Sequence, residues 1–164
     1  MNFCEHLLID GYNLIHAWPE LRQVLDVVGP EAAVQRLVDQ VRVLHDGDQL
    51  RTSVVLDGKG SRVSIEHPGK QETFAVIYTP SGLTADAFIE QFAERVSDPE
   101  NVIVATRDNA LALTVFSYGG RHWDPDKLAD RLAAAEKRQA ARLAQHRAHA
   151  KKQWKRGLFD EFQA

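Results

Sequence analysis

Short apolar segments alternate along this chain with segments whose apolar residues recur at helical spacing. Within each short segment the apolar residues are consecutive, a pattern typical of strands buried on both faces of a helix-covered parallel sheet. The pattern therefore predicts an α/β fold with three layers (α/β/α), a central parallel sheet of four or five strands, and a long C-terminal helix. Strands are predicted at residues 6–10, 52–56, 73–78 and 102–105, with an edge strand at 121–123. Helices are predicted at 30–45, 85–96, 109–117 and from Pro125 to about Arg156, where Gly157 would end the last one. A loop that contains Trp18-Pro19-Glu20 is predicted between the first strand and the first of these helices.

An acidic residue follows or accompanies the end of each predicted inner strand. Asp10 ends the first strand, Asp57 follows the second, Asp86 opens the helix after the third, and Asp108 lies just past the fourth. Because ligands bind beyond the carboxyl ends of strands in such sheets, we expect these four carboxylates at one edge of the sheet. Each also has an ordinary structural explanation, since Asp-Gly is a turn dipeptide and aspartate suits a helix N-terminus.

Gathered carboxylates repel one another by about 4 kcal/mol per pair at ~4 Å and an effective dielectric constant of ~20. A hard divalent cation with oxygen ligands, Mg²⁺ or Mn²⁺, would neutralise them and could activate a water for attack on a phosphodiester. Glu90, four residues after Asp86, could be a further ligand or shape the edge of the site, or the two could form a solvated helix face. Asn13 is placed to support the first acid. The basic residues expected to contact phosphates are Lys59, Arg62, Arg107 and Arg121.

The net charge of −3 is divided unevenly along the chain. Residues 1–136 hold 12 Lys/Arg against 21 Asp/Glu, and residues 137–164 hold 8 against 2. We therefore expect a nuclease-like domain at 1–136 and a basic helical extension at 137–164, which binds RNA or is simply a solvated helix. The residues of the extension expected to bind RNA are Lys151, Lys152, Lys155 and Arg156.

Other classes of function are disfavoured by what the sequence lacks. Cys4 is the only cysteine, so no intrachain disulfide can form. The absence of an export signal and of a long apolar stretch predicts a cytoplasmic protein without a membrane partner. The motifs of dinucleotide-binding proteins, P-loop proteins, serine hydrolases and zinc proteases are absent.

Several motifs together resemble the YacP-like branch of the NYN domain family, a group of PIN-like nucleases. These motifs are LIDGYNLI followed by AWPEL, then VVLDG, TADAFIE and ATRD, and the resemblance spans about residues 6–135. It implies a PIN-like fold, a Mg²⁺- or Mn²⁺-binding site and endoribonuclease activity, with one branch cutting messenger RNA at the ribosome.

Carried over position by position, the resemblance assigns Asp10, Asp57, Asp86 and Asp108 to the acidic site, with Asn13 as the polar partner of the first. The family commonly has Ser-Asp where this chain has Arg107-Asp108. That arginine could hold a phosphate or could pair with the acids and occupy the metal position. The alternative prediction is therefore a non-catalytic RNA- or ribosome-binding module with a degenerate PIN-like site.

Overall fold

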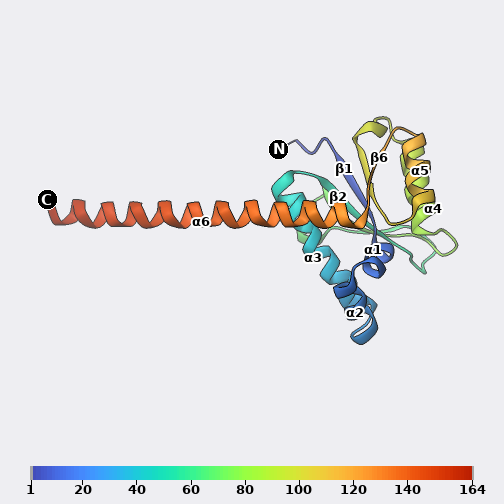
Figure 1. Cartoon of the computed structure of the whole chain (residues 1–164), viewed down its shortest axis with the longest axis horizontal. Coiled ribbons are helices and arrows are strands. Elements are labelled where there is room, and N and C mark those ends of the chain that lie inside the picture. Colours follow the sequence, from blue (N-terminus) through green and yellow to red (C-terminus); the bar gives the residue numbers. More distant parts are fainter. Residues whose placement is uncertain (1, 164) are drawn as a thin grey trace.

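A six-stranded sheet forms the centre of the computed structural model, which describes residues 2–163 (Figure 1). The strand order is β3-β4-β2-β1-β5-β6, and all neighbouring strands are parallel except the antiparallel pair β3–β4. The strands are β1 (His6–Asp10), β2 (Arg51–Leu56), β3 (Ser64–Glu66), β4 (Phe74–Tyr78), β5 (Val102–Ala105) and β6 (Arg121–Trp123).

Helices cover both faces of this sheet, as the continuous apolar strands predict. The helices are α1 (Gly11–Ala17), α2 (Pro19–Val27), α3 (Pro30–Asp48), α4 (Ala85–Arg95), α5 (Asn109–Ser117) and α6 (Pro125–Gln163), with short 3₁₀ turns η1 (Pro68–Lys70) and η2 (Pro99–Asn101). Helices α1, α2, α3 and the start of α6 pack on one face in a large apolar cluster, and α4 and α5 pack on the other in a smaller one. The predicted three-layer α/β/α architecture is confirmed.

The register of the strands brings their carboxyl ends to one edge. Asp10 is the partner of Val55, Ile9 of Ala105, and Leu56 of Tyr78. The last residues of β1, β2, β4 and β5 therefore lie at nearly the same level. We call this edge the carboxyl edge of the sheet.

Three local predictions differ from the structure. The sequence pattern missed β3, because all of its residues are exposed and it has no apolar face to reveal it. The loop predicted between the first strand and residue 30 was wrong: this segment forms α1 and α2, with Trp18 between them and Pro19 in the first turn of the second helix. Gly157 does not end α6, because a single glycine costs a helix only about 1 kcal/mol and no proline follows it.

Helix α6 has two halves with different surroundings. Leu128, Leu132 and Ala135 are buried in the larger apolar cluster, and Arg138 forms an ion pair with Asp48 of α3. Beyond this point the helix leaves the body and projects away from it (Figure 1). The predicted division between residues 136 and 137 thus falls inside one continuous helix.

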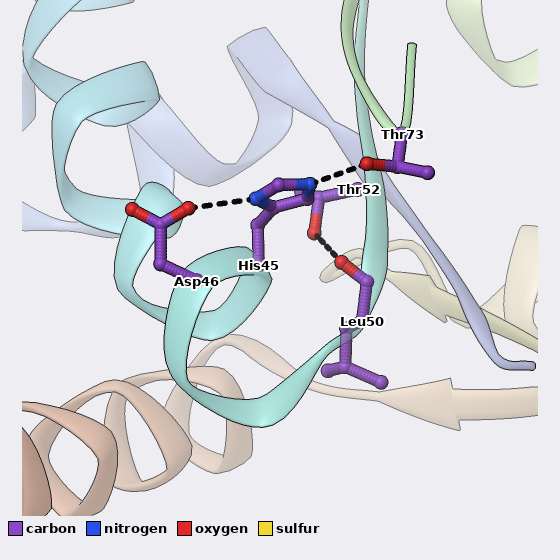
Figure 2. Close-up of polar contacts among 5 residues, drawn as sticks. All are labelled: His45, Asp46, Leu50, Thr52 and Thr73. Carbon is purple, nitrogen blue, oxygen red and sulfur yellow. Dashed lines mark hydrogen bonds and ion pairs between the residues drawn. The ribbon is translucent and has the colours of Figure 1, made fainter. Parts of the chain in front are cut away.

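A buried histidine fastens α3 to the sheet (Figure 2). His45 bonds through Nδ1 to Oδ1 of Asp46 at 2.8 Å and through Nε2 to Oγ1 of Thr73 at 2.7 Å. Its ring also packs edge-on against Phe74. Both ring nitrogens therefore have partners, so this histidine has a structural role. Within residues 2–163, no helix combines the length and apolar character needed to cross a bilayer.

Candidate functional site

Asp10 is the centre of the candidate site at the carboxyl edge. Its side chain is only 5% exposed, and its Oδ2 accepts a hydrogen bond from the Thr106 hydroxyl at 3.1 Å. The pKa of Asp10 is raised to about 8, chiefly because burial penalises the charged form. The adjacent Asp86 raises it further, because its carboxyl forms a hydrogen bond with Asp10 and adds negative charge, and the charge of Asp57 contributes as well. Asp10 therefore interacts electrostatically with two of the other three predicted acids, Asp57 and Asp86.

Asp57 positions the helix that carries Asp86. Its Oδ1 accepts a hydrogen bond from the backbone N–H of Ala85 at 2.7 Å, which fixes the start of α4 against the end of β2. Thr84 caps the same helix by accepting from the N–H of Ala87 at 3.1 Å. These two contacts hold the first turn of α4, and with it the carboxyl of Asp86, against Asp10.

Asp108 joins the site indirectly, through Thr106. Its backbone N–H donates to Oγ1 of Thr106 at 3.1 Å, and that hydroxyl in turn donates to Asp10. The carboxyl of Asp108 caps α5, because Oδ1 accepts from the N–H groups of Ala110 at 2.9 Å and Leu111 at 3.3 Å. The structural explanation of this residue is thus confirmed, and its place beside Thr106 keeps it at the same edge.

Two of the glycines that follow these acids are required by close packing. A Cβ on Gly11 would lie 2.4 Å from Cδ2 of Leu56, and one on Gly58 would lie 2.2 Å from the carbonyl oxygen of Thr79. A larger residue at position 58 would push the loop after Asp57 away from the backbone of Thr79, and one at position 11 would displace the buried side chain of Leu56. The Asp-Gly pairs therefore let the chain pass close to its neighbours where the carboxylates are delivered.

Asn13 and Arg107 meet across the edge. The side-chain Oδ1 of Asn13 accepts a hydrogen bond from the backbone N–H of Arg107 at 2.7 Å, which ties α1 to the segment after β5. Within the described residues 2–163, none of the four predicted acids forms an ion pair with a lysine or arginine. The arginine side chain is exposed and does not take the place of a cation among the acids.

The other predicted residues are spread more widely. Glu90 lies one helical turn beyond Asp86 and is half-buried, while Lys59 and Arg62 are exposed in the loop that follows β2 at the carboxyl edge. Arg121 begins β6 at the opposite edge, where it pairs with Glu5, so its predicted contact with phosphates at the acidic site is not supported. Lys151, Lys152, Lys155 and Arg156 are exposed on the projecting half of α6, away from the acids.

Thr106 is the site residue that sequence reasoning missed. It is fully buried and is the one hydroxyl that connects Asp10 with the backbone of Asp108. Its position directly after a buried strand and two residues before an acid was a usable signal. Threonine at a strand end is common, so only the bridging geometry reveals its role.

The donor set suits a hard divalent cation by its chemistry, since carboxylate oxygens are the ligands that Mg²⁺ and Mn²⁺ prefer. Within residues 2–163, no three carboxylate, imidazole or thiol groups already stand in a ready-made metal-ligating arrangement. The hydrogen bond and the negative charge of Asp86 both help to raise the pKa of Asp10. A bound cation would favour the charged forms of both carboxyls instead.

Comparison with known proteins now gives the family. The YacP-like NYN domain model matches residues 7–163, and the match includes most of the basic extension. The uncharacterized protein YacP of Bacillus subtilis (strain 168) is 29% identical over 133 residues, covering 80% of this chain and 77% of that protein.

Crystal structures of Rae1 (YacP) from Bacillus subtilis give the same result for the fold. A single-substitution variant matches with a TM-score of 0.70 and 27% identity, covering 86% of this chain and 82% of that one. A second structure has a TM-score of 0.70 and 26% identity, covering 97% and 92%. With its mostly parallel sheet and PIN-like architecture, this chain belongs to the YacP-like NYN domain family.

Proposed function

We propose that this protein is a metal-dependent endoribonuclease that hydrolyses phosphodiester bonds in RNA, with messenger RNA on the ribosome as its substrate. The observation that carries the proposal is the buried Asp10, held against Asp86 and near Asp57 with no basic side chain paired to any of them in residues 2–163. A fold keeps such an arrangement at a cost in stability, so a charged ligand is its natural complement.

The residues that would hold Mg²⁺ or Mn²⁺ are Asp10, Asp57, Asp86 and Asp108. When bound, such an ion lowers the pKa of a water ligand and stabilises negative charge on phosphate oxygens. The chain itself supplies the orientation: Thr106 fixes one oxygen of Asp10, and the contact of Asp57 with Ala85 fixes the helix bearing Asp86. The proton shared by Asp10 and Asp86 must leave before both carboxylates can act as ligands.

Basic side chains beside the acids would hold the RNA backbone. Lys59 and Arg62 are exposed in the loop after Asp57, and Arg107 is exposed beside Asp108. Asn13 fixes the backbone of Arg107, so the arginine side chain starts from a defined position at the edge. Glu90, one turn beyond Asp86, would shape the entrance of the site.

The projecting half of α6 would bind RNA of the ribosome through phosphate contacts. Lys151, Lys152, Lys155 and Arg156 are all exposed there, and residues 137–159 contain no acid. Such binding should weaken steeply with salt, because each neutralised phosphate releases counterions. Replacing these four residues by glutamine should reduce co-sedimentation with ribosomes at low salt and leave cleavage of short free RNA unchanged.

Cleavage of labelled RNA by the purified protein tests the proposal. We expect cleavage with Mn²⁺, none with EDTA, and a loss of at least 100-fold in Asp10→Asn and Asp86→Asn. Asp26→Asn, on an exposed position of α2, is the matched control and should cleave normally. Because the substrate is proposed to be a translating message, the assay includes messenger RNA on ribosomes. Cleavage that survives EDTA or both substitutions on that substrate refutes the mechanism.

A second candidate is a non-catalytic RNA- or ribosome-binding module. It is favoured by the lack of a ready metal-ligating arrangement in residues 2–163 and by the use of the Asp108 carboxyl as a helix cap. Titration of the protein with Mn²⁺ in a calorimeter separates the two. Binding that disappears in Asp10→Asn supports the nuclease, whereas no acid-dependent binding supports the module.

A further inference from the structure

The outer part of α6 packs against no other element among the described residues. From Glu136 to Gly157 every residue is exposed, and Arg142 is the last of them to line a pocket with α3, so residues 143–157 form about 22 Å of helix that projects alone (Figure 1). Helices of this length are marginal in water unless an apolar face packs against something. A helix that leaves the body so completely therefore needs a partner to be well ordered.

An apolar line runs along α6 and continues past the body. Leu132, Leu143 and Trp154 are spaced by 11 residues, which is about three helical turns plus 20°, so the three side chains lie almost in a row. Leu132 is buried in the body, whereas Leu143 is 53% and Trp154 is 68% exposed. The line thus begins in the core and ends in solvent.

A groove of about 470 Å³ lies at the buried end of this line. One wall is the α1–α2 junction, including Trp18 and Leu21, and the other is the first part of α6, including Leu132. Glu20 and Glu136 also line it, so the groove combines an apolar interior with negative charge. A dry cavity of about 150 Å³ holds benzene, so this groove has room for an indole ring.

We propose that two copies of this chain pair through antiparallel α6 helices, with Trp154 of each copy filling the groove of the other. A two-fold axis at Leu143 places residues equally distant from that position opposite one another. It therefore sets Trp154 of one copy against Leu132 of the other at both ends, and Leu143 against Leu143 at the centre. One spacing satisfies all three contacts at once, as an isologous interface requires.

Charge supports the same register. The axis brings Glu136 to within about one residue, ~1.5 Å along the helix, of the level of Lys151 in the second copy. Both residues lie on the same flank of the apolar line, and like flanks face each other in an antiparallel pair. Lys152 and Arg156 are turned about 200° and 240° away from Leu132, so this part of the basic surface used by the proposed function stays open, while Lys151 pairs across the dimer.

Sedimentation equilibrium of the full chain tests the pairing directly. We expect the 18.4 kDa chain to sediment as a dimer, and Trp154→Ala or Leu143→Arg to raise the dissociation constant at least 30-fold. Phe116→Ala removes a side chain that is 74% exposed on α5 and should leave the dimer intact. A monomer at about 100 μM chain, or a dimer indifferent to Trp154→Ala, overturns the proposal.

Charge exchange and crosslinking test the geometry. Glu136→Lys and Lys151→Glu should each weaken the dimer, and the double variant should restore it. Leu143→Cys in a Cys4→Ser background should form a disulfide between copies on mild oxidation, whereas Phe116→Cys should not. Failure of both rescue and crosslinking overturns the register. A monomer whose Trp154→Ala variant loses RNA binding assigns the face to RNA instead. None of these measurements depends on RNA cleavage, so the result is independent of the proposed function.

Discussion

Replacing Asp10 by asparagine should stabilise the metal-free protein while removing a proposed catalytic group. The native side chain is buried beside Asp86, where its negative charge is unfavourable. Asparagine has nearly the same shape, can accept the hydrogen bond from Thr106, and can donate one to the carboxylate of Asp86. The substitution therefore keeps the contacts and removes the cost of ionisation.

The magnitude follows from the pKa of Asp10, which is raised from 3.8 to about 8. Each tenfold step in proton affinity is worth about 1.4 kcal/mol, so ionisation in the folded protein costs roughly 5–6 kcal/mol more than in the unfolded chain. Because the folded state holds a proton that the unfolded state releases, stability is full below about pH 4 and falls as the pH rises to about 8. Asp86 shares the proton, so we expect asparagine to recover about 3 kcal/mol at pH 8.

Urea unfolding in EDTA from pH 4 to pH 9 measures this directly. The stabilities of the native protein and of Asp10→Asn should nearly coincide at pH 4 and diverge steadily up to pH 8. Asp26→Asn, an exposed acid on α2, controls for the loss of one carboxyl and should run parallel to the native curve. A variant that also runs parallel to the native curve, or is less stable at pH 8, would show that Asp10 is not held at a raised pKa.

Three further predictions concern single residues around the fold. Thr106→Val should lower stability by about 1–3 kcal/mol in thermal unfolding, because it leaves Asp10 and a backbone N–H without their partner, whereas Thr106→Ser should be nearly neutral. Gly58→Ala should lower the free energy of unfolding by about 1–3 kcal/mol, because its Cβ would lie 2.2 Å from a carbonyl oxygen. Gly47→Ala in α3 is the control: its Cβ meets nothing within 4 Å, so it should raise the free energy of unfolding by up to ~1 kcal/mol. Burial and nearby positive charge lower the pKa of His6 to about 4, so the native protein should lose up to about 3 kcal/mol of stability as the pH falls from 6.5 to 4. His6→Gln should lack this loss. An NMR titration of His6 with a midpoint near 6.5 would contradict the prediction.

Much of the secondary structure could be predicted because its signals are local. Four of the five predicted strands were recognisable as short apolar runs, α3 and α4 as 3.6-residue periodicities, and α5 by the acid that precedes it. The acids at strand ends were predicted to share one edge, and three of them act on one another there. The sequence by itself thus determined five of the six strands, the helices from α3 onward, the parallel sheet and the edge where its polar residues gather.

Only the tertiary structure decided how each polar group is used. It buries Asp10 beside Asp86, makes Thr106 the bridge to Asp108, and carries Arg121 to the opposite edge with Glu5. It also adds β3, forms α1 and α2 where a loop was predicted, and continues α6 past Gly157. Local periodicity fixes which residues are helical or extended, but burial and charge partners depend on chain segments as many as 116 residues apart, whose approach no short pattern records.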